Sequence, residues 1–411
     1  MKLLFASCLF TTLTPLAAQA RDGAAPNAVL HWNRVVAEAL AAAKIDPLTE
    51  SRVLAIVQLA VHGALAAVDA GSGTGPETAA SAAAVAAAAS EAASGLLPGL
   101  SMLDEELERS LQAIAAGEPR SRGIEAGRAA AAASLAARAG DGSDRKADVP
   151  AGTRPGEYQP TPPDLTPAWM AHWGSVTPFS LRSSDQFRSP PPPAVDSALG
   201  KRDVEQVCCI GGRSSSLRDE EHSLIARFWY ESSPQSWNRI ACTVAQSRQL
   251  DARESARLLA LVNVAMADGY IASFEAKYHY AYWRPTTAIR AAGAPEWLSF
   301  LDTPPVPDYP SAHAVLGAAA ATVLARFFAN DFVAFETTSG QPFPGIERRF
   351  WSFSQAAQEN AASRVLAGLH FPVAVSAGCR LGEDIGTWAF EHALAPVEGQ
   401  RAAAAAHAPR R

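Results

Sequence analysis

Residues 308–328 read DYPSAHAVLGAAAATVLARFF, and this stretch decides the fold class. The approach to it is stiffened by four prolines, at positions 304, 305, 307 and 310. Ser311 then stands where a helix is expected to begin, because serine is a favoured N-cap. The alanines after it have the highest intrinsic helix propensity. The stretch therefore predicts a helix whose free N-terminal N–H groups form a pocket for an anion.

Helical patterns also occur on both sides of this stretch. Apolar residues recur at helical spacing, or alanine dominates, in segments 35–40, 53–60, 79–93, 129–139, 217–230, 251–276, 312–328 and 349–367. Strand-like alternation is scarce, and residues 149–200 are rich in proline and polar residues, which favours an irregular connection. We therefore predict an all-α protein of two packed helical bundles joined by a long proline-rich connection.

The predicted boundaries divide the chain into four parts. Residues 1–20 form a signal peptide, and 21–200 form an N-terminal helical layer with the connection. Residues 201–395 form a C-terminal helical domain that carries the chemistry, and 396–411 form a flexible tail.

Composition excludes two broad classes of protein. The 411 residues are 48% hydrophobic and 18% charged, whereas a disordered chain needs low hydrophobicity and high net charge. The chain has 35 Lys and Arg residues and 41 Asp and Glu residues, which gives a formal charge of -6. It has no dense basic run before the terminal arginines. We therefore expect a mostly folded chain without a nucleic-acid partner.

The first 20 residues have the layout of a secretory signal. Lys2 is charged, residues 3–16 are uncharged and mostly apolar, and residues 18–20 read AQA, an A-x-A cleavage site. We expect an exported protein, periplasmic or secreted, with no membrane span in the mature chain. The remaining cysteines are Cys208, Cys209, Cys242 and Cys379. An oxidising compartment permits a disulfide between Cys242 and one of the first two, and unpaired thiols are an equal alternative.

Three C-terminal segments combine cations with histidines. In KYHYAYWRP, Lys277 stands seven residues before Arg284, so a helical path would place both on one side. Pro285 predicts a boundary at Arg284. In PSAH, His313 falls in the first helical turn after Ser311.

The third segment is SRVLAGLHFP, residues 363–372. Arg364 and His370 would point about 120° apart on a continuous helix. Gly368 and Pro372 therefore predict that the helix ends and a turn brings both to one ligand. Each segment alone also fits an ordinary structural role: a solvated basic face, a plain serine cap, or a packed core histidine.

Together, K-x6-RP, PSxH and SR-x5-H resemble the three motifs of the vanadium-dependent haloperoxidase and type-2 phosphatidic acid phosphatase superfamily. The form WRPTTAIR, residues 283–290, is more similar to the bacterial haloperoxidase branch. Further segments similar to that branch are RVLAIVQLAVHGALAAVDA (52–70), PGEYQPTPP (155–163), LIARFW (224–229) and ARLLALVNVAMAD (256–268). The resemblance implies a haloperoxidase/acid phosphatase-like helical fold.

The resemblance also implies a site for vanadate, in which phosphate could take the same place. The oxyanion would be held by Lys277, Arg284, Ser311, the backbone N–H of Ala312, and Arg364. His370 would bind vanadium axially, His313 would be the acid–base residue, and Lys277 would polarise the activated peroxide. Arginine forks and a lysine point charge suit a multiply charged tetrahedral oxyanion.

The chain departs from the family pattern at two positions. Ala312 replaces the usual glycine of PSGH, which adds one methyl group but keeps the backbone donor. Ala374 stands where many members carry an aspartate four residues after the last histidine. Such a carboxylate would fix the tautomer of His370, so its absence predicts weaker catalysis unless a backbone carbonyl serves instead.

Three functions fit these residues. The first is an exported vanadate-dependent peroxidase that oxidises halide or an organic sulfide with hydrogen peroxide. The second is a phosphatase that acts on phosphate esters through a phosphohistidine at His370, with His313 protonating the leaving alcohol. The third is a catalytically weak helical protein that only captures oxyanions. The sequence leaves the halide, the physiological substrate and the oligomeric state open.

Three other polar residues are expected to have minor roles or none at the site. His62 lies in an apolar helical stripe and is expected in the core. His279 lies beside the cationic motif, where an incidental position is favoured over lining the pocket. Asp268 is a candidate partner for one of the arginines.

Overall fold

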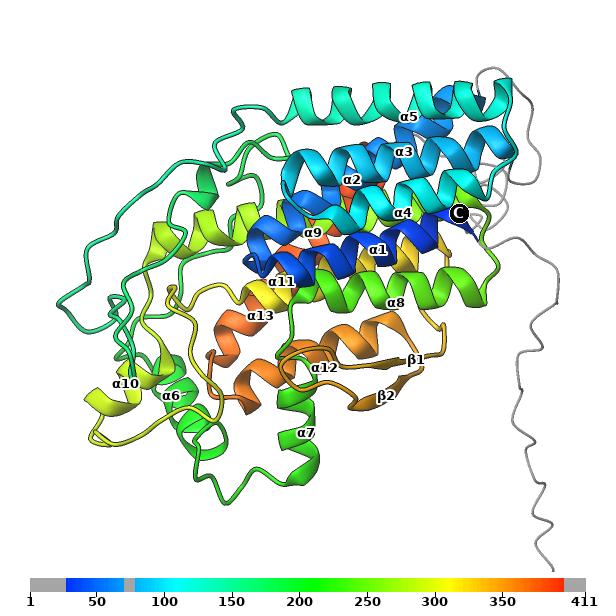
Figure 1. Cartoon of the computed structure of the whole chain (residues 1–411). Coiled ribbons are helices and arrows are strands. Elements are labelled where there is room, and N and C mark those ends of the chain that lie inside the picture. The colour runs from blue at the N-terminus through cyan, green and yellow to red at the C-terminus, as the bar shows by residue number, and fades with distance from the viewer. Residues whose placement is uncertain (1–26, 70–77, 395–411) are drawn as a thin grey trace, which may run out of the picture.

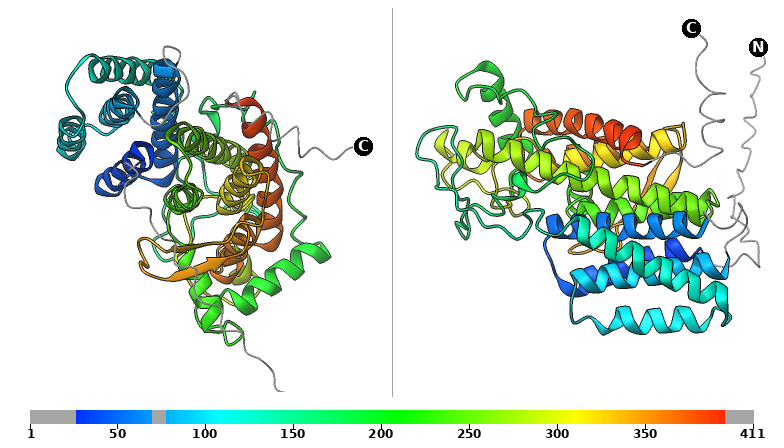
Figure 2. Two further views of the ribbon diagram at one scale, coloured as in Figure 1. Left: turned by 90° about the vertical axis from the view of Figure 1, so that its right-hand side faces the viewer. Right: turned by 90° about the horizontal axis from the view of Figure 1, so that it is seen from above.

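The computed structural model describes residues 27–69 and 78–394. These residues form 13 α-helices, one short 3₁₀ turn and one two-stranded sheet. The predicted all-α class with two packed helical bundles is confirmed. Figure 2 shows the N-terminal helices, blue to cyan, grouped beside the C-terminal ones. The predicted signal peptide and the tail at 396–411 lie outside the described residues, and the boundary near residue 200 stays a prediction.

The N-terminal bundle packs through small side chains. Its helices are α1 (Ala28–Ala43), α2 (Pro47–Asp69), α3 (Ala79–Leu96), α4 (Ser101–Gln112) and α5 (Glu118–Ala137). A Cβ atom on Gly123 or Gly127 of α5 would lie 2.2 or 2.5 Å from a backbone oxygen of α3. The backbones of α3 and α5 therefore approach more closely than larger residues permit, which explains the alanine-rich composition.

The connection between the bundles is irregular, as predicted. Residues 138–197 contain one short element, η1 (Trp173–Ser175). The chain turns directly after α5, where Gly140 and Gly142 both have positive φ. Asp141 anchors this region, because its Oδ2 accepts from Nε of Arg52, at 2.8 Å, and of Arg138, at 3.0 Å.

The C-terminal half contains the remaining elements (Figure 1). They are α6 (Ala198–Ile210), α7 (Glu220–Phe228), α8 (Ser233–Ser247), α9 (Ala252–Tyr280), α10 (Pro285–Ala291), α11 (Ala312–Phe327), β1 (Phe335–Thr338), β2 (Glu347–Phe350), α12 (Phe353–Leu366) and α13 (Pro372–His392). The helix predicted over 349–367 begins at Phe353, because residues 347–350 pair antiparallel with β1.

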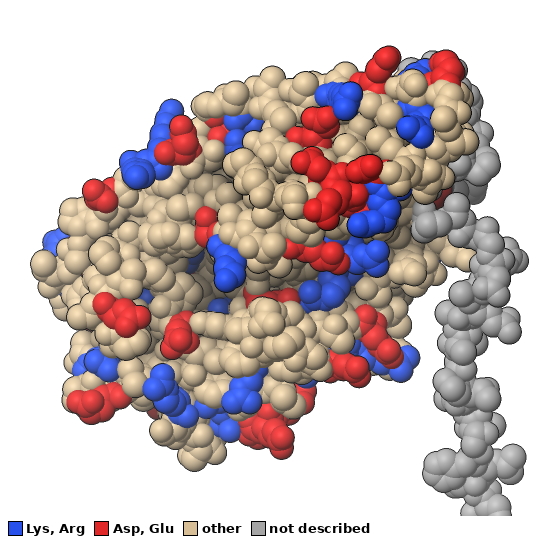
Figure 3. Space-filling model, viewed as in Figure 1, with Lys and Arg blue, Asp and Glu red and all other residues tan. Residues whose placement is uncertain are grey.

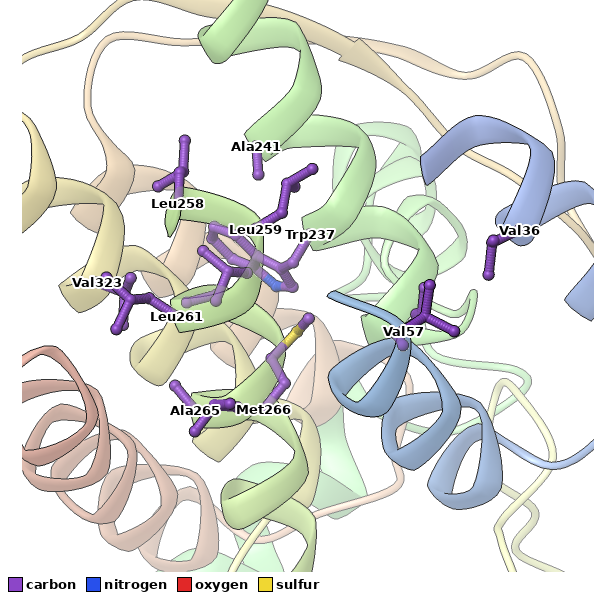
Figure 4. Packing of buried hydrophobic residues seen from close by; sticks show 14 of the residues in the cluster. Val36, Val57, Trp237, Ala241, Leu258, Leu259, Leu261, Ala265, Met266 and Val323 are labelled. Carbon is purple, nitrogen blue, oxygen red and sulfur yellow. The ribbon is translucent and has the colours of Figure 1, made fainter. Parts of the chain in front are cut away.

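Helix α9 connects the two bundles. A capping box of Asp251 and Glu254 starts it, and most of its 29 residues are buried. It packs against α2 on one side and α11 on another. Figure 4 shows Leu258, Leu259 and Met266 of α9 within this core, near Trp237 of α8.

Helices α2 and α9 are long and apolar enough to cross a membrane by length and composition alone. In α9, 94% of the apolar stretch is buried inside the protein, and in α2 the share is 67%. Burial in the core accounts for the apolar character of α9.

Helices α11 and α13 pack backbone to backbone. Gly378, Gly382 and Gly386 of α13 lie four residues apart, on one face of the helix. A Cβ on them would lie 2.6, 2.2 and 2.6 Å from the carbonyl oxygens of Ser311, Val315 and Ala319, respectively. This contact places the start of α11 beside the residues that precede α13.

Candidate functional site

The three cationic motif segments meet at one buried place. Lys277 lies in the last turn of α9, Arg284 is the N-cap of α10, and Arg364 lies near the end of α12. His370 lies in the turn between α12 and α13. Each of the three cations is 1% exposed and His370 is 4% exposed. The structure thus brings together these four residues, which are far apart in sequence.

The path from Lys277 to Arg284 differs from the continuous helix considered above. Helix α9 ends at Tyr280, and Ala281 adopts a left-handed conformation with φ 44°. Arg284 is extended, with φ -85° and ψ 156°, as expected before Pro285. The predicted boundary is therefore correct, but helical spacing does not bring the two cations together.

The proline-rich segment before α11 holds both cations instead. Nζ of Lys277 donates to the carbonyls of Pro307, at 2.7 Å, and Asp308, at 3.0 Å. Nε of Arg284 donates to the carbonyl of Val306 at 2.7 Å, and its Nη1 donates to that of Leu369 at 2.8 Å. These backbone contacts fix the side chains without neutralising them.

The turn that carries His370 forms as the third segment predicts. Helix α12 ends at Leu366, and Gly368 has φ +78°. A side chain at Gly368 would meet the carbonyl oxygen of Gly211 at 2.2 Å, so only glycine fits here. Pro372 is the first residue of α13, where its missing N–H costs nothing.

Two donors at this place lack partners. Ser311 is the N-cap of α11, as predicted, yet its hydroxyl makes no capping bond, and Oγ is buried and unpaired. Arg364 donates from Nη1 to the carbonyl of Trp229 at 3.2 Å, whereas its Nε is buried and unpaired. Unpaired buried donors are costly. Together with the first-turn N–H of Ala312 they fit the oxygens of a bound oxyanion such as vanadate or phosphate.

The cations at this place repel one another, and burial strengthens the effect. Burial, followed by the charge of Arg284, holds the pKa of Lys277 well below its usual value. Burial also lowers the pKa of Arg364 to about 10. The pKa values of His313 and His370 are lowered well below the usual range by burial and then by the neighbouring cations. Both histidines are therefore neutral near pH 7, and an anion would relieve the repulsion among the cations.

A buried carboxylate that the sequence analysis did not identify lies next to His370. Oδ1 of Asp308 is 2.9 Å from Nδ1 of His370 and 3.7 Å from Nη1 of Arg284. Neither carboxylate oxygen has a partner at good hydrogen-bond angles. Burial raises the pKa of Asp308 to about 7, although Arg284 and Lys277 act in the opposite direction. The available signal was its position, three residues before Ser311 in DYPSAH.

His313 occupies the first turn of α11, as predicted, with a half-buried side chain. Its Nε2 lies 3.3 Å from the carbonyl oxygen of Glu231. Its own carbonyl accepts from Nδ2 of Asn360 at 3.0 Å, which ties α11 to α12.

Three minor expectations can be compared with the structure. Asp268 was expected near a site arginine, which is wrong, because its carboxylate accepts from the backbone N–H groups of residues 179–181 and the hydroxyl of Ser180. His279 is exposed, in agreement with an incidental position. His62 is half-buried rather than in the core.

The remaining features bear on ligand class. Cys208, Cys209, Cys242 and Cys379 are free thiols, so the considered disulfide is not formed. Within residues 27–69 and 78–394, no group of three or more His, Cys, Asp or Glu side chains is arranged to hold a metal cation.

The face in Figure 3 is hollowed left of its centre, and basic and acidic side chains are interspersed over it.

Comparisons with known proteins agree with this geometry. Residues 257–399 match the family model of the VCPO second helical-bundle domain. The chain is 26% identical over 272 residues to vanadium chloroperoxidase of Curvularia inaequalis, which is 48% of this chain and 45% of that protein. The match thus spans about half the length of this curated relative.

Solved structures extend the similarity to nearly the whole chain. The first bacterial vanadium-dependent iodoperoxidase has a TM-score of 0.77 at 28% identity, over 89% of this chain and 96% of that one. A holo-type bacterial vanadium-dependent chloroperoxidase has a TM-score of 0.66 at 18% identity, over 85% of this chain and 93% of that one, which shows the shared fold.

Proposed function

We propose that this chain, which is vanadium haloperoxidase-like in its C-terminal sequence and its fold, binds vanadate and oxidises a halide or an organic sulfide with hydrogen peroxide. The observation that carries the proposal is the buried convergence of Lys277, Arg284 and Arg364 around the unpaired donors of Ser311 and Arg364. Such a cluster is electrostatically unfavourable unless an anion fills it.

Each side chain has a role that follows from its contacts. Lys277, Arg284, Arg364, the Ser311 hydroxyl and the Ala312 N–H would hold the oxygens of vanadate, and His370 would bond its vanadium. When bound, vanadate supplies a Lewis acid of oxidation state +5 that activates peroxide toward two-electron donors. Lys277 would polarise the activated peroxide, because it adds positive charge in a site closed to water.

His313 is suited to proton transfer. Its lowered pKa keeps the imidazole neutral near pH 7, so it can take a proton from incoming hydrogen peroxide. With a halide, peroxide and one proton give hypohalous acid and water, and with a sulfide, peroxide gives a sulfoxide and water.

A phosphatase is the second candidate, and one contact favours it. The absence of a carboxylate at Ala374 argues against an oriented histidine nucleophile, but Asp308 supplies a carboxylate at Nδ1 of His370. His370 could then attack phosphorus while His313 protonates the leaving alcohol, and water would hydrolyse the phosphohistidine.

One comparison separates these functions. The purified protein is loaded with vanadate and assayed for bromination of a dye with hydrogen peroxide, and a metal-free sample is assayed with a chromogenic phosphate ester. We expect vanadate-dependent bromination that His370→Ala abolishes. Phosphate release without bromination would instead establish the phosphatase, and vanadate binding without either reaction would establish an oxyanion-binding protein.

Export is part of the proposal and rests on the sequence of residues 1–20. Expression of the full chain in a bacterial host, followed by N-terminal sequencing of the periplasmic product, should give a mature protein that begins at Arg21. Retention in the cytoplasm with an intact leader would contradict it.

A further inference from the structure

We infer that Asp308 is a positioning residue that holds His370 in the tautomer whose Nε2 carries the lone pair, in place of the carboxylate that position 374 lacks. The inference rests on the proposed oxyanion site, because the lone pair on Nε2 matters only if His370 bonds the ligand.

The ring contacts of His370 assign its tautomer. Nδ1 lies 2.9 Å from a carboxylate oxygen of Asp308, and a carboxylate accepts a hydrogen bond. Nη1 of Arg284 lies 3.1 Å from Nε2 and 3.5 Å from Nδ1, so the shorter contact is to Nε2, and a guanidinium can only donate. The shortest contact of each ring nitrogen therefore favours the same neutral imidazole, with the proton on Nδ1 and the lone pair on Nε2.

The position of Asp308 suits this role. Its side chain is fully buried, and it belongs to the segment that Lys277 and Arg284 hold through backbone carbonyls. The carboxylate is therefore presented by backbone that the cations of the same site fix in place. The present angle at Oδ1 is poor, and such contacts commonly tighten when a ligand binds.

Alternatives for this role are occupied elsewhere. The carbonyl of Leu369 accepts from Arg284, and that of Ala374 accepts from the N–H of Ser311. The buried Asp203 accepts from the N–H of Val373. Glu383 and Asp384 lie on α13 beyond its first turn, too far along the helix to reach His370.

The arrangement also explains why Ala374 is tolerated. A carboxylate there would come from the first turn of α13, whereas Asp308 comes from the segment before α11. These segments are adjacent, because the N–H of Ser311 donates to the carbonyl of Ala374 at 2.9 Å. A carboxylate on either segment can thus accept a hydrogen bond from Nδ1 of His370, and in this chain the carboxylate comes from the segment before α11.

The test measures the imidazole and the ligand separately. Protein labelled with ¹⁵N histidine is examined by NMR at pH 8 without ligand, and the His370 signals are assigned by comparison with His370→Asn. Vanadate and inorganic phosphate affinities are then measured by calorimetry. The variants are Asp308→Ala and Asp308→Asn. Asp268→Asn is the control, because Asp268 is also a buried carboxylate but binds residues 179–181 and not His370.

We expect wild-type His370 to carry its proton on Nδ1 only. Asp308→Ala should populate the Nε2–H tautomer and weaken vanadate binding roughly 10- to 100-fold, as losses of such outer partners usually do. Asp308→Asn preserves shape and an acceptor, so it should keep the tautomer with a smaller loss of affinity. Asp268→Asn should lower Tm but leave both readouts unchanged.

Wild-type tautomer and wild-type affinity in Asp308→Ala would overturn the inference. Failure of the proposed function would give a different result. The wild type would then bind vanadate without brominating the dye, while Asp308→Ala would still lose the Nδ1–H tautomer. In that case Asp308 positions His370, but the protein is not a peroxidase. If vanadate does not bind even the wild type, the tautomer measured without ligand still decides whether Asp308 orients His370.

Discussion

The α-carbon of Gly382 faces the carbonyl oxygen of Val315 so closely that a Cβ on it would lie 2.2 Å from that oxygen. Since the oxygen belongs to the backbone of α11, Gly382→Ala must push α11 and α13 apart. We expect a loss of about 1–3 kcal/mol of stability from overpacking. Oxyanion affinity should fall as well, because Ser311 on α11 moves relative to the turn that carries His370.

Gly63→Ala is the matched control, because a Cβ there meets only the Cβ of Ala130 at an ordinary 3.8 Å. This substitution in the middle of α2 should raise stability by roughly 0.5–1 kcal/mol and leave affinity unchanged. Thermal denaturation and phosphate titration of both variants check the pair. Equal stability of Gly382→Ala and wild type would contradict the close packing.

The Ser311 hydroxyl should contribute to ligand binding but not to folding. It is buried, unpaired and does not cap α11. Ser311→Ala should therefore keep the wild-type Tm and lose about 1.5–3 kcal/mol of vanadate binding, the usual value of a hydrogen bond to a charged group.

Ser236→Ala should give the opposite result, because that buried hydroxyl donates to the carbonyl of Ser233 at 3.1 Å, in α8. It should lower Tm and leave affinity intact. A stability loss in Ser311→Ala without a change in affinity would show that the hydroxyl serves the fold.

Glu50 connects the N-terminal bundle to the site. This buried carboxylate of α2 accepts from the hydroxyl of Ser232 and from Nε2 of Gln235, the latter at 2.6 Å. The turn it holds is continuous with residues 229–231, whose carbonyls at 229 and 231 contact Arg364 and His313. Glu50→Ala leaves two donors unpaired, which should cost about 1–3 kcal/mol of stability, and should also weaken oxyanion binding.

Glu38→Ala provides the control, since that side chain is 62% exposed and pairs only at 3.9 Å with Arg34. It should change neither stability nor affinity measurably. If Glu50→Ala lowered Tm but bound phosphate like the wild type, the N-terminal bundle would support the fold without shaping the site.

Asp308 should make stability depend on pH. Its pKa is about 7 in the folded protein, against 3.8 for the ordinary group, so the folded state binds the proton more tightly. Stability therefore decreases as pH rises between these two values. Asp308→Asn removes this dependence, so the Tm of the variant relative to wild type should increase from pH 4 to pH 7 and then level off.

Scanning calorimetry in buffers without phosphate or vanadate measures this difference. A Tm difference that stays constant from pH 4 to pH 8 would mean that the folded protein does not raise the pKa of Asp308.

The sequence predicts the helical class and the site cations, because both depend on local patterns. Alanine-rich and apolar stripes mark most of the helices, and residues such as Arg284 and His370 stand beside a proline or a glycine that ends an element. Helix α13 was not singled out, because its buried face carries Gly378, Gly382 and Gly386 instead of large apolar residues.

The role of Asp308 was not predictable from local patterns. Its contact with His370 joins residues 62 positions apart, and it depends on how α11 packs on α13. The family pattern directed attention to Ala374, four residues after His370 and in the first turn of α13, whereas the carboxylate comes from the segment before α11. The prediction that Asp268 pairs with a site arginine was wrong for the same reason, since its partners are backbone N–H groups of the distant connection.

The most direct test of the central claim is a crystal structure of the vanadate-soaked protein, with vanadium located by its anomalous scattering. The predicted result is one vanadium site surrounded by Lys277, Arg284, Arg364 and Ser311, with the metal bonded to Nε2 of His370. A vanadium site elsewhere, or no vanadium at these residues at saturating vanadate, would contradict the account.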